Sequence, residues 1–127
     1  MSYEDVTGYV DYDAGTELAT SVRDRLEGDG HDDPKLLRVE LERMKQFQEA
    51  ADRTVDSCQQ QINQLKWQRM ALHGQEAADR FDGAIAQLDR ISDRANRLIG
   101  LLVDTIKVAE DALDRWETRQ RRFRTRK

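Results

Sequence analysis

The sequence predicts an all-α protein: an antiparallel two-helix hairpin with coiled-coil-like packing, preceded by a short N-terminal helix and forming a four-helix bundle on dimerisation. Three observations support this class. Apolar residues recur with a heptad period over two long segments, only a His-Gly pair separates these segments, and the 127 residues contain a single proline. A chain with 36% charged and 6% aromatic residues is typical of helical hairpins and not of enzymes with a deep core.

The two long segments form the arms of the predicted hairpin. Alternating steps of four and three residues from Leu37 to Leu72 meet an apolar residue at nine of eleven positions, and the same steps from Ala78 to Trp116 do so at eleven of twelve. A mean period of 3.5 places these residues on one face of a slightly underwound helix. Two such faces pack against each other in a left-handed coil.

The predicted turn consists of Leu72, His73 and Gly74, with the break at residues 73 and 74. Glycine ends helices because it accepts a backbone conformation that other residues avoid. So short a connection requires antiparallel neighbours. If facing residues are counted outwards from this turn, Cys58 lies near Asp89 and Leu37 near Glu110, to within one turn.

Residues 1–33 form an acidic N-terminal arm with ten acidic and two basic residues, a charge of −8. Within it, residues 16–27 predict a short helix that Gly28 ends, and Asp33 is placed to cap the next helix, which begins at Pro34. The apolar and aromatic residues before the short helix either dock on the rod or bind a partner: Tyr3, Val6, Tyr9, Val10 and Tyr12.

The second arm has a wider apolar face than the first. A third column, mostly apolar, follows its seam at seven-residue intervals: Ala77, Ala84, Ile91, Leu98, Thr105 and Ala112. Three columns per heptad indicate a second neighbour. We therefore predict a partner interface at Ile91, Leu98, Leu101 and Val103. The alternative is that the residue 18–26 helix folds back over this patch.

Trp67 lies off the seam of the first arm, near the turn. It either covers the end of the hairpin or anchors a partner there, because exposed tryptophan is enriched among residues that dominate binding energy. If the predicted interface is right, replacing Leu98 and Leu101 together by Asp abolishes association and leaves the hairpin helical.

The hairpin extends over residues 34–118 and is followed by a basic tail, residues 119–127. The tail carries a charge of +6 and no acidic residue; its cations are Arg119, Arg121, Arg122, Arg124, Arg126 and Lys127. It suits nucleic acid or an anionic membrane, or else it pairs with the acidic arm. The rest of the chain carries −10 and repels phosphate, which makes nucleic acid the weaker hypothesis.

No catalytic or metal-binding pattern occurs in the sequence. The single Cys58 falls on the seam, where a thiol acts as a small apolar side chain, with a redox role as the alternative. The cluster of Asp29, His31, Asp32 and Asp33 has the composition of a loop and matches no calcium or zinc spacing. We therefore expect neither enzymatic activity nor a cofactor.

No apolar run approaches the roughly 18 to 20 residues that cross a bilayer, and the N-terminus lacks the features of a secretory signal. We expect synthesis in the cytoplasm, and any export to proceed without a cleaved signal peptide.

The residues at the turn, LHGQEAADRF, support a hypothesis about function. Leu72-His73-Gly74 occupies the place of a Trp-x-Gly turn, and Ala77, Ala78 and Phe81 that of the small and aromatic residues after it. This stretch resembles the junction of the WXG and LXG helical hairpins of bacterial type VII secretion systems. The resemblance implies dimerisation into a four-helix bundle, and service as a co-exported or chaperone-like partner of a larger secreted effector.

The chain also departs from that family. A tyrosine-x-x-x-acid export signal is missing after the second arm, and a similar pattern occurs only at residues 9–13. This departure favours the partner role, through a homodimer or a heterodimer with a helical effector. Two alternatives stay open: a structural coiled-coil subunit of a larger assembly, and a nucleic-acid-associated protein that uses the basic tail.

Overall fold

The computed structural model describes residues 10–28, 33–71 and 74–125, with side chains described as far as Arg122. These residues form three helices and no strand: α2 (Tyr12–Glu27), α3 (Pro34–Met70) and α4 (Gln75–Thr125). The predicted all-α class is confirmed.

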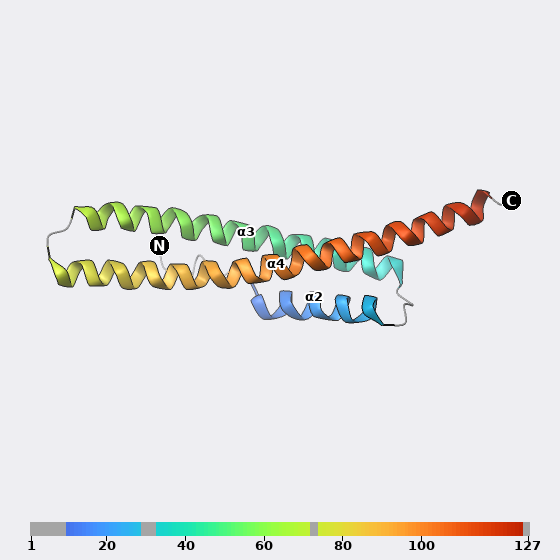
Figure 1. Cartoon of the computed structure of the whole chain (residues 1–127), viewed down its shortest axis with the longest axis horizontal. Coiled ribbons are helices and arrows are strands. Elements are labelled where there is room, and N and C mark those ends of the chain that lie inside the picture. Colours follow the sequence, from blue (N-terminus) through green and yellow to red (C-terminus); the bar gives the residue numbers. More distant parts are fainter. Residues whose placement is uncertain (1–9, 29–32, 72–73, 126–127) are drawn as a thin grey trace.

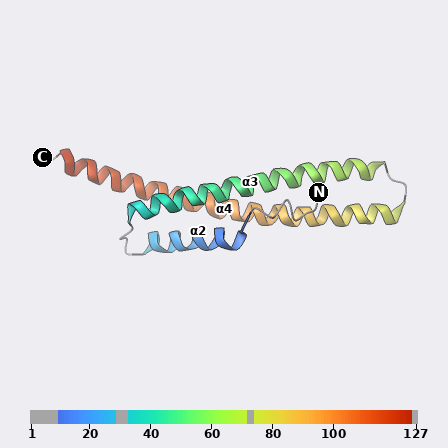
Figure 2. The same ribbon diagram turned by 180° about the vertical axis from the view of Figure 1, so that it is seen from behind.

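The helices form an elongated rod (Figure 1). α3 and α4 lie side by side and run in opposite directions, with the turn between them at one end, which we call the tip (Figures 1 and 2). α2 packs beside them over the half of the rod away from the tip, which we call the base half. The last part of α4 extends past the start of α3 and packs against no other helix (Figure 1).

α2 begins four residues earlier than predicted, at Tyr12 and not at Thr16. The reason is Asp11, whose side chain accepts a hydrogen bond of 3.0 Å from the backbone N–H of Ala14 and so caps the helix. The predicted end is confirmed, because the helix finishes at Glu27 and the N–H of Gly28 donates to the carbonyl of Asp24.

α3 begins as its sequence predicts. The carboxylate of Asp33 accepts a hydrogen bond of 2.9 Å from the N–H of Lys35, and Pro34 occupies the first turn, where its missing N–H costs nothing. Of the predicted turn, Leu72 and His73 lie outside the described residues. Gly74 has a φ of 153°, a backbone conformation that side chains other than glycine rarely adopt.

Two clusters of buried side chains form the core. The larger one, the base cluster, lies where all three helices meet and contains Val10, Ala19, Val22, Leu37, Leu41, Met44, Ala51, Ala95, Leu98, Leu102, Ile106, Ala109 and Leu113. The smaller one, the tip cluster, lies between α3 and α4 alone and contains Cys58, Ile62 and Leu88. Because burying one large apolar side chain is worth about 1.5 to 3 kcal/mol, the base half holds most of the apolar stabilisation.

Ion pairs connect α3 and α4 at both ends of the rod. Near the tip, Arg69 and Asp82 approach to 2.7 Å, and at the base Arg38 and Glu117 approach to 3.0 Å. The partner of Arg69 lies about one helical turn further along α4 than the residue predicted to face Arg69. The partner of Arg38 lies about two turns further along α4 than the residue predicted to face Arg38. Arginine and glutamate side chains are long enough to reach along the rod, and Leu37 lines one cleft with Leu113, within a turn of Glu110, so the predicted register holds to within one turn.

The charge boundary between residues 118 and 119 is not an end of secondary structure. α4 continues through Arg119 as one helix of 51 residues. The segment 119–125 is therefore the C-terminal part of α4, and the basic residues that follow, Arg126 and Lys127, lie outside the described residues.

Candidate partner interface

The predicted interface was wrong at its centre. Leu98 is only 4% exposed, because α2 covers it. A Cβ atom added at Gly15 would lie 3.2 Å from Cδ1 of Leu98, so the backbone of α2 lies directly on this side chain. The alternative, that the N-terminal helix folds back over the patch, is the one that the structure has.

Small residues on α2 allow this close packing. Gly15, Ala19 and Val22 follow one another at helical spacing, and all three are buried. The sequence shows this stripe once the helix is extended back to Asp11. The prediction missed it because the helix was expected to begin at Thr16, after Gly15.

The other predicted interface residues are spread over the molecule and not brought together. Leu101 is half-buried against the base cluster, and Ile91 is half-buried against the tip cluster. Val103 is 44% exposed on α4. Of the four predicted residues, Val103 is therefore the one with an exposed side chain, and Ile91 borders the start of α2, where it lines a hollow with Asp11, Tyr12 and Asp13.

α2 packs against two columns of residues, one on α3 and one on α4. The residues of each column follow one another at seven-residue intervals. On α3, Glu40 binds Arg25 of α2, and Phe47, seven residues later, has a ring carbon 3.4 Å from the position of a Cβ at Gly15. On α4, Leu98 occupies the matching column. Both columns continue towards the tip, beyond the first residue of α2.

The continuation of these columns forms what we call the tip surface: Gln61 and Gln68 on α3, and Ala77, Ala84 and Ile91 on α4. The three α4 residues are half-buried. Ile91 lines a hollow together with Asp11, Tyr12 and Asp13 at the start of α2, whereas nearer the tip Figure 1 shows no third helix among the described residues. On α3 there is also an open groove of about 880 Å³, lined by residues of that helix alone: Ser57, Gln60, Gln61, Asn63, Gln64, Leu65, Trp67 and Gln68. A groove of this kind suits a helix from another chain.

The tip surface is uncharged, although 36% of the chain is charged. Residues 57–65 contain no Asp, Glu, Lys or Arg. Trp67, at the edge of the groove, is 74% exposed, and Met70, one turn further, is 76% exposed. Little of the indole therefore packs against the described residues, and both side chains are available for contact with a partner.

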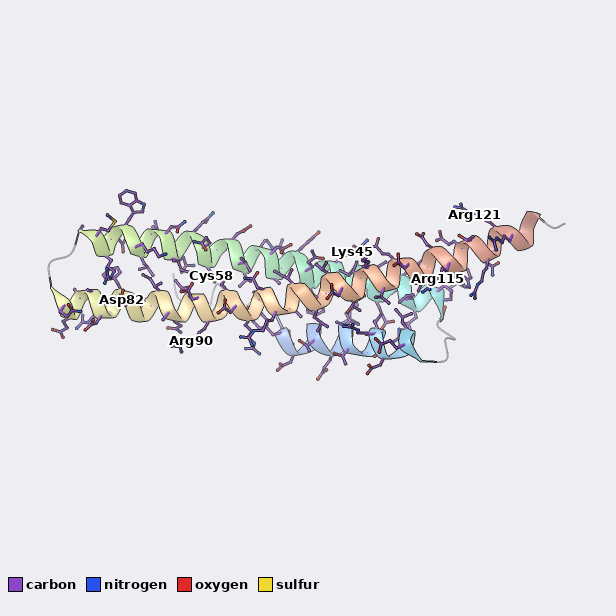
Figure 3. The ribbon with its side chains drawn as sticks, in the orientation of Figure 1. Lys45, Cys58, Asp82, Arg90, Arg115 and Arg121 are labelled. Carbon is purple, nitrogen blue, oxygen red and sulfur yellow. The ribbon has the colours of Figure 1, made fainter. Side chains whose placement is uncertain are left out.

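Cys58 lies between α3 and α4 and is fully buried (Figure 3). Burial raises the pKa of the Cys58 thiol, and the nearby carboxylate of Asp89 raises it further. The thiolate is the reactive form, so a raised pKa keeps this thiol unreactive. The geometry agrees with the interpretation of Cys58 as a core residue.

Tyr12, at the start of α2, has a similar electrostatic environment. Burial raises the pKa of its hydroxyl and Cys58 adds to the rise, whereas Arg94, whose guanidinium lies 4.5 Å from the ring centre, lowers it. Arg94 also approaches Asp13 to 3.6 Å. These contacts fasten the first turn of α2 to α4 at the boundary between the base half and the tip surface.

We expect stability to fall at alkaline pH because of these two groups. A raised pKa in the folded state means that the stabilisation is fully present below the unfolded pKa, near 9 for Cys58 and 10 for Tyr12, and is lost as the pH rises through the folded pKa. Urea unfolding followed by circular dichroism should show a constant free energy of unfolding from pH 7 to about pH 8.5 and a decline above it. In Cys58→Ala the decline should be shallower; an unchanged slope would contradict a buried, neutral thiol.

The basic tail is only partly described. Arg119, Arg121 and Arg122 are exposed on the part of α4 that extends beyond the other helices, and Arg121 marks it in Figure 3. The side chain of Arg124 lies outside the described residues. Of the acidic loop, Asp33 caps α3, whereas Asp29, His31 and Asp32 lie outside the described residues.

Within residues 10–28, 33–71 and 74–125, no three His, Cys, Asp or Glu side chains are arranged so that they could hold a metal ion. None of the helices there combines the length and the apolar character that a membrane span requires. Comparison with protein-family models, with curated proteins and with solved structures finds no significant match to this chain.

Proposed function

We propose that this chain is a non-enzymatic helical hairpin that acts as the partner of another helical protein, as WXG and LXG proteins do for type VII secretion effectors. It would bind by helix–helix packing at the tip surface, either as a chaperone-like partner or as a co-exported component. The observation that carries this proposal is the continuity of two heptad columns. They hold α2 in the base half and continue past its first turn, which borders Ile91, towards the tip, where Figure 1 shows no third helix among the described residues.

The size of the tip surface fits a short helix. From Ile91 to Ala77 the α4 column spans 14 residues, or roughly 21 Å at 1.5 Å per residue. A partner helix of about four turns would lie in line with α2 and contact α3 and α4 together. The packing of α2 supplies the template, because α2 itself has 16 residues and uses the same two columns.

The chemistry of the tip surface favours burial against a protein. Removing a charge from water costs several kcal/mol unless a partner compensates it, whereas amide side chains both donate and accept hydrogen bonds. The glutamines of the groove can therefore be covered by a helix of varied sequence. Trp67 and Ile91 would supply the apolar contact area.

Two stoichiometries suit this surface. Two copies related by a two-fold axis would place their tip halves together as a four-helix bundle, each hairpin supplying the second pair of helices. A hairpin of a larger effector would give the same bundle as a heterodimer.

We expect Ala84→Glu, which places a charge in the centre of the tip surface, to weaken association about tenfold or more. Association would be measured by sedimentation equilibrium, first with the chain alone and then with the purified helical region of an effector encoded beside its gene. Circular dichroism should show unchanged helicity, because Ala84 is only half-buried.

Asn96→Glu is the matched control, since it introduces the same charge on the same helix at an exposed polar position outside the tip surface. If this control weakened association as much as Ala84→Glu, or if neither variant changed it, the tip surface would not be the interface. If the native chain sedimented as a monomer both alone and with that effector region, the partner function would be refuted.

A structural coiled-coil subunit is the second candidate function. The projecting end of α4 supports it, because an end that packs against no other helix can join one rod to the next (Figure 1). This function requires open-ended polymers whose size grows with concentration. A single defined complex would favour the partner function instead.

A further inference from the structure

A second concave site lies at the base of the rod, far from the tip surface. There the end of α2, the start of α3 and the last quarter of α4 enclose a cleft of about 190 Å³. Its apolar floor is formed by Leu26, Pro34, Leu37, Ala112 and Leu113, and its rim by Arg25, Arg115, Trp116 and Arg119. The position of Arg115 in Figure 3 marks this end of the molecule. No residue of the cleft belongs to the tip surface.

The rim of the cleft is basic on its α4 side. Arg25 directs both ends of its guanidinium to the carboxylate of Glu40, which largely neutralises its charge, so the positive charge of the rim comes from Arg115 and Arg119. Arg115 and Arg119 are exposed one turn apart on α4, with side chains that lie on the same face. From residue 119 onwards the chain has no acidic residue, so the positive potential extends along the projecting end of α4.

The floor and one wall of the cleft are apolar. Trp116 is 38% exposed and lines the cleft, while the guanidinium of Arg38 lies 5.9 Å from its ring centre. A cavity of about 150 Å³ holds a benzene molecule, so the volume here suits one aromatic or branched aliphatic side chain. The cleft therefore combines space for one apolar group with arginines that bind carboxylates.

We propose that the base cleft binds an acidic peptide segment of a partner protein, with one apolar side chain seated on Leu37 and Leu113 and flanking carboxylates on Arg115 and Arg119. The arginines of the rim favour an acidic ligand because they attract carboxylates. The apolar floor favours a peptide because a peptide can also supply an apolar side chain. A nucleic acid would use the arginines but has no apolar group for the floor.

Trp116 allows binding to be measured directly. In a Trp67→Phe background it is the single tryptophan of the chain, so its fluorescence reports on the cleft. The probe is an acetylated peptide, Asp-Glu-Leu-Phe-Glu-Asp, and the control peptide has Asn and Gln in place of the acids. We expect a saturable change in emission with the acidic peptide and none with the control.

Three variants distinguish binding in the cleft from non-specific attraction of the peptide to positive charge. Arg119→Gln should raise the dissociation constant about tenfold, because it removes one charge-assisted contact. Ala112→Phe, which fills the floor without changing charge, should abolish saturable binding. Arg122→Gln removes the same charge from the same segment outside the cleft, and should change the dissociation constant less than about twofold.

Several outcomes would overturn the proposal. Equal losses in Arg119→Gln and Arg122→Gln, or undiminished binding in a correctly folded Ala112→Phe, would show that the peptide binds only to diffuse charge. Tighter binding of a single-stranded DNA oligonucleotide, insensitive to Ala112→Phe, would assign the segment to nucleic acid. If Ala112→Phe fails to fold, the pair of exposed arginine variants decides the question.

Discussion

The variant Leu98→Asp is expected to release α2 from the rod and to lower the free energy of unfolding by about 3 to 5 kcal/mol. Leu98 is 4% exposed and lies beneath Gly15, so a carboxylate there would be buried without a counter-charge. Release of α2 is the less costly outcome, because it exposes the carboxylate to water. Urea unfolding and limited proteolysis of the folded variant would measure the two effects.

The matched control is Val103→Asp, which introduces the same group at an exposed position of α4. It should leave stability and protease resistance within about 0.5 kcal/mol of the native chain. If Leu98→Asp behaved in the same way, α2 would not cover Leu98 in solution. The outcome also bears on the double replacement of Leu98 and Leu101, which would detach α2 before it affected any partner.

The variant Glu40→Ala is expected to cost about 1 to 3 kcal/mol, less than a fully buried pair because Arg25 remains one-third exposed and can turn to water. The Glu40 side chain is only 10% exposed and accepts two hydrogen bonds from the Arg25 guanidinium. It joins the last turn of α2 to the start of α3. Arg25→Lys should lose part of this stabilisation, because an ammonium cannot form the paired contacts of a guanidinium.

A double-mutant cycle of Arg25→Ala and Glu40→Ala, followed by urea unfolding, would isolate the pair. We expect a coupling energy of about 1 kcal/mol or more. Glu42→Ala on the exposed side of α3 is the matched control and should be nearly neutral. A coupling energy indistinguishable from zero would mean that apolar contacts alone hold α2.

The helix ends, the apolar seams and the all-α class were predicted correctly because residues close together in the sequence determine them. Asp33 and Pro34 begin α3, and Gly28 ends α2, because caps act within a few residues of a helix end. The apolar seams also follow from one helix at a time, which is why Leu41, Cys58 and Leu102 were placed in the core. The all-α class follows from the same patterns.

The position of α2 could not be predicted, because it depends on contacts between residues far apart in the chain. The third apolar column of α4 indicated correctly that a second neighbour packs there. It did not say whether that neighbour comes from the same chain, since Leu98 is equally apolar in both cases. The contacts that decide the matter are the meeting of Gly15 with Leu98 and the pairing of Arg25 with Glu40.

Counting outwards from the turn was enough to place the arms, because Leu37 lines the base cleft with Leu113, within one turn of Glu110. The cleft itself was missed, since its lining comes from three separate helices.

The place of α2 in the chain has a consequence for the order of folding during translation. α2 leaves the ribosome before α3 and α4, but the side chain on which Gly15 rests belongs to the middle of α4. Contacts of such high sequence separation form late. Of these three helices, the first to be synthesised should therefore be the last to dock, and α2 stays accessible to chaperones and partners until the middle of α4 has emerged.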